Sequence, residues 1–138
     1  MFNVLGDINW LAVLAGFAAF ALLGGLWFAL LFPKQYNHSL GRPADAQPIR
    51  SPLFLAGPPL CALIITITTA TLIQALHITT YADALVFALI AGIGYLVANT
   101  TTIAINPNFP HPLRYAAISG GYNVIGLVLV SLLNVAIS

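Results

Sequence analysis

Hydrophobic residues fall into four long runs along this chain, separated by short polar stretches. The runs cover Asn9–Leu31, Leu53–Ile78, Ala84–Ile105 and Ala116–Ile137, and none of them contains Lys, Arg, Asp or Glu. Each run has about 20 residues or more, the length that an α-helix needs to cross about 30 Å of hydrocarbon. Lipid offers no hydrogen bonds, so helices are the simplest way to satisfy the backbone there. The pattern predicts an all-α integral membrane bundle of four transmembrane helices, a single domain over residues 1–138.

Two proline-rich connections separate the first run from the second and the third from the fourth. Residues 32–52 contain four prolines and residues 106–115 contain three. Prolines end helices and stiffen the turns outside them. Residues 79–83 form a tighter turn between the second and third runs, in which Asp83 is placed to cap the third helix. The connections therefore predict helices that run alternately up and down through the bilayer.

Charged residues are rare in this chain. Four Lys+Arg and three Asp+Glu make up 5% of the residues, against about 25% in a typical soluble domain. So few charges could not keep a water-facing surface wetted, which argues against a soluble protein. The net charge of +1 gives no field that would attract nucleic acid, so we expect no nucleic-acid partner. One cysteine, Cys61, excludes an internal disulfide and a Cys-based metal cage.

All of the basic residues lie in the two proline-rich connections. They are Lys34, Arg42, Arg50 and Arg114. With four crossings, both of these connections fall on one side of the membrane and the termini on the other. Under the positive-inside rule the basic side is cytoplasmic. We therefore expect a multi-pass protein with cytoplasmic loops at about 32–52 and 106–115 and both termini outside.

Polar side chains inside the predicted helices form a candidate binding site in the cytoplasmic half of the membrane. Its members are Tyr95, Asn99, Ser119, Tyr122, Asn123 and Trp27. In the third helix the spacing of Tyr95, Asn99 and Thr102 places them on one face, and the fourth-helix members also share a face. Two interpretations remain open. These groups either hydrogen-bond between helices, as polar residues in membrane bundles do, or line a hydrated pocket or a lipid-headgroup site.

The histidines offer little metal chemistry. His38 and His111 lie in the two basic connections, which the topology could bring together, whereas His77 lies at the opposite end. Two histidines without a fixed carboxylate make a poor metal site, so we expect no metal and no other cofactor. His111 beside Arg114 is instead a candidate contact for anionic lipid headgroups, which basic pockets on the cytoplasmic side bind.

Small residues recur four positions apart within the predicted helices. Two such strips are Ala21, Gly25, Ala29 and Ala84, Ala88, Gly92. Residues four apart are neighbours on a helix surface, and small ones let helices approach closely in lipid. The strips could serve packing within one chain or contacts between chains. Because a bundle of this size has little interior, we expect a homo-oligomer.

Missing features narrow the function further. No ionisable residue lies deep in a helix, which disfavours a proton-driven transporter, and no nucleophile is paired with a base and an acid, so we expect no enzyme. The preferred hypothesis is a non-enzymatic, homo-oligomeric bundle that binds a lipid, small molecule or membrane partner. The alternatives are a small transporter or channel with a polar path between the third and fourth helices, and a membrane enzyme acting on lipid headgroups near His111 and Arg114.

Short motifs in the first and fourth helices point to a family. Asn9-Trp10 opens the first helix, Gly25-Leu26-Trp27-Phe28 closes it, and Ile118-Ser119-Gly120-Gly121-Tyr122 lies early in the fourth. With these motifs the chain resembles, over nearly its whole length, the small bacterial membrane proteins grouped as domain of unknown function 1761. The resemblance implies four helices in a bacterial inner (cytoplasmic) membrane and no established activity. Relatives often carry His after the fourth-helix Tyr, where this chain has Asn123, so no proton relay is expected there.

Overall fold

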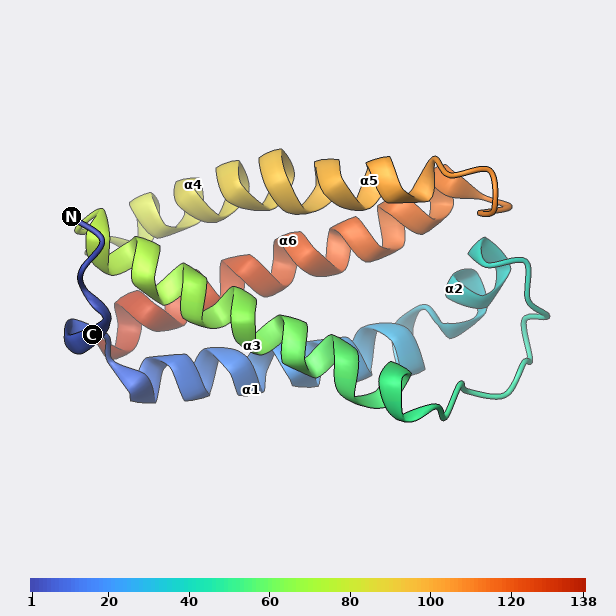
Figure 1. The fold of residues 1–138 in the computed structure, drawn as a ribbon, viewed down its shortest axis with the longest axis horizontal. Helices are drawn as coiled ribbons and strands as arrows, with labels where there is room; N and C mark the ends of the chain where they lie inside the picture. The colour runs from blue at the N-terminus through green and yellow to red at the C-terminus, as the bar shows by residue number, and fades with distance from the viewer.

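The four apolar runs form four long helices that lie side by side. In the computed structural model, which describes residues 1–138, the helices long and apolar enough to cross a membrane are Trp10–Leu31, Pro52–Ala75, Tyr81–Ala104 and Pro112–Ile137. Figure 1 shows them as one elongated bundle. The prediction of an all-α integral membrane bundle with four transmembrane helices is confirmed.

Two of the four crossings contain a π-helical turn, a wider turn than the α-helix has. In chain order the elements are a 3₁₀ turn (Leu5–Asp7), α1 (Trp10–Leu26), a π-helical turn (Trp27–Leu31), α2 (Pro33–Ser39), α3 (Pro52–Ala75), α4 (Tyr81–Ala91), a π-helical turn (Gly92–Val97), α5 (Ala98–Ala104) and α6 (Pro112–Ile137). The third crossing therefore consists of α4, a π-helical turn and α5 in direct succession.

Side-chain caps mark the helix starts, and one of them differs from the prediction. The Asn9 side chain caps α1 by accepting from two backbone N–H groups of its first turn. The cap of α4 is Thr80, whose hydroxyl oxygen accepts from the Asp83 N–H at 3.1 Å. The prediction that Asp83 is the cap is therefore wrong. Thr80 and Asp83 form a reciprocal pair, in which the Thr80 hydroxyl donates to the Asp83 carboxylate at 2.7 Å, and this motif starts the helix earlier than the apolar run does.

Helices also extend into the polar connections. The loop predicted at 32–52 contains the short helix α2, which begins at Pro33, and α6 begins at Pro112 rather than at residue 116. Proline suits the first helical position, where its missing N–H has no helical partner to lose. The hydrophobic pattern marks the part of each helix that contacts lipid, so it misses turns that continue into water.

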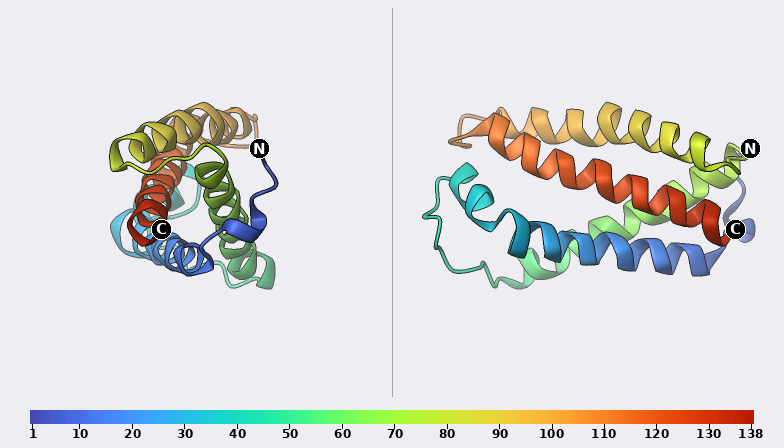
Figure 2. Two further views of the ribbon diagram at one scale, coloured as in Figure 1. Left: turned by 90° about the vertical axis from the view of Figure 1, so that its left-hand side faces the viewer. Right: turned by 180° about the vertical axis from the view of Figure 1, so that it is seen from behind.

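α6 is the central helix of the bundle. It packs against α1, α3, α4, α5 and α2, whereas α3 packs mainly against α1 and α6. Figure 2 shows α6 between α1 and α4 in both views. Glycines allow this crowding: a methyl group at Gly126 would overlap the ring of Phe20, and one at Gly120 would lie 3.3 Å from Val97. α6 can therefore approach the helices on both sides closely.

The two ends of the bundle differ in character. The termini and the turn between α3 and α4 lie at one end, while α2, the following loop and the α5–α6 turn lie at the other (Figure 1). At the first end the chain ends are tied together, because the Asn9 amide donates to the Ile137 carbonyl at 2.8 Å. All four basic residues lie at the second end, called here the basic end. The predicted grouping of the bases on one side is thus confirmed.

Candidate functional site

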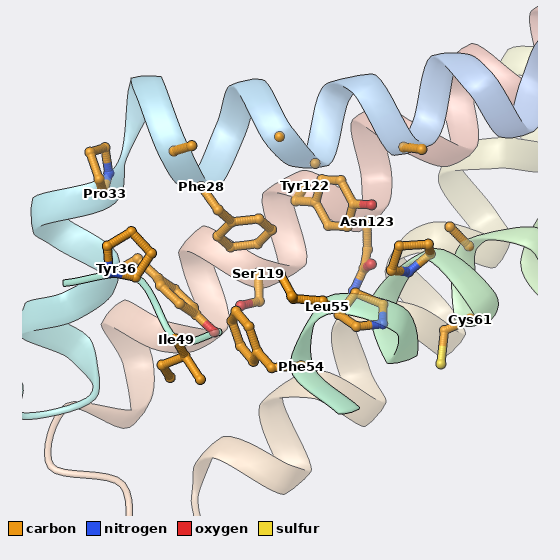
Figure 3. A pocket seen from close by; sticks show the side chains of 18 of the residues that line it. Phe28, Pro33, Tyr36, Ile49, Phe54, Leu55, Cys61, Ser119, Tyr122 and Asn123 are labelled. Atoms are coloured by element: carbon orange, nitrogen blue, oxygen red, sulfur yellow. The ribbon is translucent and has the colours of Figure 1, made fainter. Parts of the chain in front are cut away.

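A cavity of about 690 Å³ opens at the basic end of the bundle. Residues of α1, α2, α3, α5 and α6 and of the loop after α2 line it, and 15 of these 26 residues are hydrophobic. Figure 3 shows Phe28, Phe54 and Leu55 around the space, with Tyr36, Ser119, Tyr122 and Asn123 bringing oxygen and nitrogen atoms to it. The cavity therefore has a mainly apolar wall with a few polar groups, the composition typical of small-molecule sites.

The α1 wall of the cavity consists largely of small residues. Ala21, Gly25 and Ala29 all line it, and a methyl group added at Gly25 would meet nothing within 4 Å. This strip was expected to bring two helices into contact, but it contributes open space instead. The second predicted strip is used inside the chain, because Ala84 and Ala88 are fully buried. The first strip thus lines the cavity with Gly25 and Ala29 exposed, and the second is used for packing within the chain.

Two consecutive prolines shape the α3 wall. Pro58 and Pro59 lie inside α3 and line the cavity, together with Phe54 and Leu55 one turn earlier. Proline has no N–H, so the carbonyls of Phe54 and Leu55 lack their usual donors four residues ahead. Polar backbone at membrane depth is tolerated where it lines a cavity. The prolines therefore leave two backbone carbonyls of this wall without their helical donors.

The deep end of the cavity is polar. The Asn123 amide donates to the Thr100 hydroxyl oxygen at 3.2 Å, and the Tyr122 hydroxyl donates weakly to the Phe20 carbonyl at 3.4 Å. Asn123 lies eleven residues, or about 16 Å, along α6 from its first residue Pro112. Ser119 lines the cavity one turn nearer the mouth. Polar groups at such depth are costly in lipid, so they usually face a cavity, where water or a ligand can hydrogen-bond to them.

The mouth of the cavity carries the positive charge. Tyr36 and Asn37 of α2 line it together with Arg42 of the following loop. The Arg42 guanidinium donates to Asn37 Oδ1 at 3.2 Å and to the Gln47 carbonyl at 2.7 Å. Burial raises the pKa of Tyr36 to about 12, with Tyr115 adding to the shift and Arg42 opposing it. The Tyr36 hydroxyl therefore stays protonated at neutral pH and can donate a hydrogen bond.

Two of the predicted site residues face away from the cavity. Tyr95 is 77% exposed on the outside of the bundle, and Asn99 is exposed beside it. Thr102 is exposed as well. The expectation that this third-helix face turns toward α6 is thus wrong, and the π-helical turn at Gly92–Val97 explains why. It inserts one residue into the helix, which rotates everything after it by about 100°. Thr100 consequently meets Asn123 in place of Asn99.

Trp27 stabilises the wall without lining the cavity. Its indole N–H donates to the Ile118 carbonyl at 3.0 Å. Its ring packs against Gly121, where an added methyl group would lie only 3.3 Å from the ring. Trp27 stands at the first position of the π-helical turn that ends the first crossing. The residue therefore joins the end of that crossing to α6, a structural contact rather than a surface open to a ligand.

The histidines of the two basic connections meet outside the cavity. His38 stacks on His111 with ring centroids 4.4 Å apart, and Arg114 Nη1 lies 2.7 Å from His38 Nδ1. Arginine can only donate, so His38 Nδ1 accepts and the imidazole is neutral with its proton on Nε2. Desolvation, followed by the positive charge of Arg114 and by His111, lowers the pKa of His38. The predicted proximity of His38 and His111 is confirmed, and both headgroup candidates, His111 and Arg114, lie in this exposed cluster.

Three residues of the site were missed in the sequence. Tyr36 and Arg42 lie in the connection at 32–52, where no hydrophobic pattern points to a cavity, and Thr100 was not among the candidate residues. Pro33 followed by seven residues without glycine was the available signal for a helix in that loop. Nothing local indicated the rotation that brings Thr100 inward. The structure joins these residues to Ser119, Tyr122 and Asn123, which the sequence had indicated.

Comparison with known proteins gives a family but no activity. No curated protein and no solved structure matches this chain. The family described as "Protein of unknown function (DUF1761)" matches residues 11–135, which include all four membrane-spanning helices almost completely. The motifs at Trp27 and at Ser119–Tyr122 lie within the matched region. The chain therefore belongs to the DUF1761 family of proteins of unknown function.

Proposed function

We propose that this protein is a non-enzymatic binding protein of the membrane, which holds a lipid or another amphipathic small molecule in the cavity at its basic end. The cavity itself supports the proposal. Its volume of about 690 Å³ lies within the range of roughly 300–1,000 Å³ found for small-molecule sites. Its apolar walls suit a hydrocarbon body, while Arg42, Tyr36 and Asn123 suit polar groups.

The small residues of one wall also support this function. Larger side chains at Ala21, Gly25 or Ala29 would narrow the space that these three positions line. Gly25 has no steric reason to be glycine, since an added methyl group meets nothing. Three small residues along one wall leave room for a ligand there.

The outer edge of the cavity reaches the lipid. Leu55 and Cys61 both line it, and both are exposed on the surface of α3, Leu55 by 59%. Because α3 packs mainly against α1 and α6, it does not seal the cavity against α5. A ligand dissolved in the hydrocarbon could therefore enter from the side. In the proposed orientation, in a bacterial inner membrane with the basic end cytoplasmic, it would come from the inner leaflet.

Transport is less well supported by the geometry. A second pocket of about 130 Å³ lies at the opposite end of the bundle, lined by Asn9, Gln74 and Asn134 among others. Phe20, Val130 and Thr66 are almost completely buried in the core between the two ends. A polar path between the third and fourth helices would be lined by Tyr95, Asn99, Tyr122 and Asn123, and of these Tyr95 and Asn99 are exposed on the outside of the bundle. A channel would need these layers to move apart.

The lipid-headgroup contact at His111 and Arg114 is proposed as an accessory surface. Both side chains are exposed at the basic end, and His38 joins them there. Anionic headgroups are attracted to basic residues at this depth of the membrane. We assign no reaction to the cluster, because His38 is engaged by Arg114 and by the stacked ring of His111.

The binding proposal is tested by filling the cavity. Gly25→Leu places a side chain in the open space beside Ala21 and Ala29, whereas Gly94→Leu makes the same change at a second helical glycine with nothing within 4 Å, away from the cavity. Both variants are purified in a mild detergent, and bound small molecules are measured by native mass spectrometry. Wild type and Gly94→Leu are expected to retain a ligand of defined mass, and Gly25→Leu to lose it.

The outcome that would overturn the proposal is equal ligand content in all three proteins, or none in any. Circular dichroism and thermal unfolding show whether each variant is folded. The native mass spectra also give the number of chains in the particle, which tests the expectation of a homo-oligomer. The cavity is complete within one chain, so ligand binding by a monomer would leave the binding proposal intact.

A further inference from the structure

Arg42 is the only charged residue among those that line the cavity. It is half-buried in the loop after α2, and its two hydrogen-bond acceptors, Asn37 Oδ1 and the Gln47 carbonyl, carry no charge. The protein has no salt bridge at Arg42 or elsewhere. A partly desolvated cation at the rim of an apolar cavity is stabilised by a counter-ion. The chain does not supply that anion.

We infer that the ligand is a single-chain amphiphile with an anionic headgroup, a carboxylate or a phosphate, which pairs with Arg42 at the mouth of the cavity. The inference rests on the proposed binding function and adds the chemical class of the ligand. Arginine presents five donors in a planar fork that matches the oxygens of either headgroup. Two nitrogens of Arg42 already donate to neighbours, so the guanidinium is held in place before the ligand arrives.

Neighbouring donors fit the same headgroup. The Tyr36 hydroxyl remains protonated at neutral pH and lines the cavity beside Asn37 and Arg42. Neither Tyr36 nor Ser119 uses its hydroxyl in a hydrogen bond with the protein. These two hydroxyls and the guanidinium are donors, and an anionic oxygen accepts from each. Charge-assisted hydrogen bonds of this kind are the stronger ones.

The remaining space fits one chain. From the mouth, one wall runs past the apolar side chains of Phe28 and Phe54 to Ala62 and Ile65. The polar groups opposite, Asn123 and Thr100, are hydrogen-bonded to each other. The distance from the start of α6 to Asn123 is about 16 Å. A cavity of about 690 Å³ is the size of sites for drug-sized ligands, which favours one hydrocarbon chain over the two chains of a phospholipid.

The test compares ligands that share a hydrocarbon chain but differ in headgroup, and variants that each remove one arginine from the loop after α2. Oleate, oleoyl lysophosphatidate and the neutral oleyl alcohol are titrated into the detergent-purified protein, and each Kd is measured by native mass spectrometry. The variants are Arg42→Gln and, as the matched control, Arg50→Gln, which removes the same charge from an exposed position of the same loop outside the cavity. Gly25→Leu identifies binding that takes place in the cavity.

At least one of the two anions is expected to bind wild type about tenfold or more tightly than oleyl alcohol does. Arg42→Gln is expected to remove this preference, and Arg50→Gln to retain it. Tighter binding of oleate or of the lysolipid shows which headgroup the site takes. Equal affinity for the alcohol and both anions would overturn the inference, as would an equal loss of anion preference in both arginine variants. In either case, ligand binding that Gly25→Leu abolishes would still support the proposed binding function. Loss of all cavity binding would overturn both.

Discussion

The indole nitrogen of Trp27 donates a hydrogen bond of 3.0 Å to the backbone carbonyl of Ile118, across 91 positions of sequence. This bond joins the π-helical turn at the end of the first crossing to the first turns of α6. The helical carbonyl of Ile118 has a lone pair to spare, and the adjacent Gly121 leaves room for the ring. The contact thus joins two of the three short motifs through which the sequence resembles the family.

Replacing Trp27 by Phe is expected to destabilise the bundle by about 1 kcal/mol, the net value of one hydrogen bond, with a further loss from the smaller ring. Thermal unfolding in detergent measures the change. Trp10→Phe is the control, since Trp10 is 51% exposed and its indole N–H has no partner in the bundle. Equal unfolding temperatures for the two variants would show that the bond to Ile118 contributes nothing.

Gly126→Ala is expected to destabilise the protein by roughly 1–3 kcal/mol, because overpacking a core forces side chains or backbone to move. The added methyl group would overlap the ring of Phe20, which is itself buried. Gly94→Ala, at an open position, should have little effect. Thermal unfolding of the pair is measured again in a Phe20→Ala background. In that background the loss of stability caused by Gly126→Ala should be smaller. An unchanged loss would show that the added methyl group clashes with a residue other than Phe20.

Two asparagines test the rotation of the third crossing. Asn99→Leu is expected to leave stability unchanged or to raise it, because this side chain faces lipid. Asn123→Leu removes the hydrogen bond to Thr100 and should cost about 0.6–2 kcal/mol, the range for such bonds between membrane helices. Unfolding by denaturant in mixed micelles gives both values. A larger loss of stability in Asn99→Leu than in Asn123→Leu would show that Asn99 faces the bundle, as regular helical spacing predicts.

The His38 cluster predicts a dependence of stability on pH. The pKa of His38 is lower in the folded protein than its ordinary value of 6.5, so the unfolded chain binds a proton more readily than the folded one. Stability is therefore fully present above pH 6.5 and declines as the pH falls toward the folded-state pKa. Unfolding temperatures between pH 8 and pH 5 should show this decline, and His38→Gln should reduce it. His77→Gln, at the opposite end, is the control and should show the same decline as wild type. If the decline is undiminished in His38→Gln, groups other than His38 cause the loss of stability at low pH.

Much of the fold follows from the sequence alone. Four uncharged apolar runs of membrane-spanning length leave the backbone no alternative to helices, because lipid cannot hydrogen-bond to it. Short connections then force alternate directions, which place Lys34, Arg42, Arg50 and Arg114 at one end. The polar residues of α6 were also recognisable, since Ser119, Tyr122 and Asn123 interrupt an otherwise apolar helix.

Only the tertiary structure decided which groups face one another. Helical spacing gives the faces of a regular helix, but the π-helical turn at Gly92–Val97 moves Asn99 outward and Thr100 inward. A turn of this kind is stabilised by packing against α6, where Gly92 and Gly120 allow close approach, and no local pattern encodes that contact. The cavity likewise arises from how α3 leans away from α5, and Arg42 joins it through a loop. Local sequence determines elements through backbone hydrogen bonding and lipid contact, whereas the site depends on distances between residues remote in the chain.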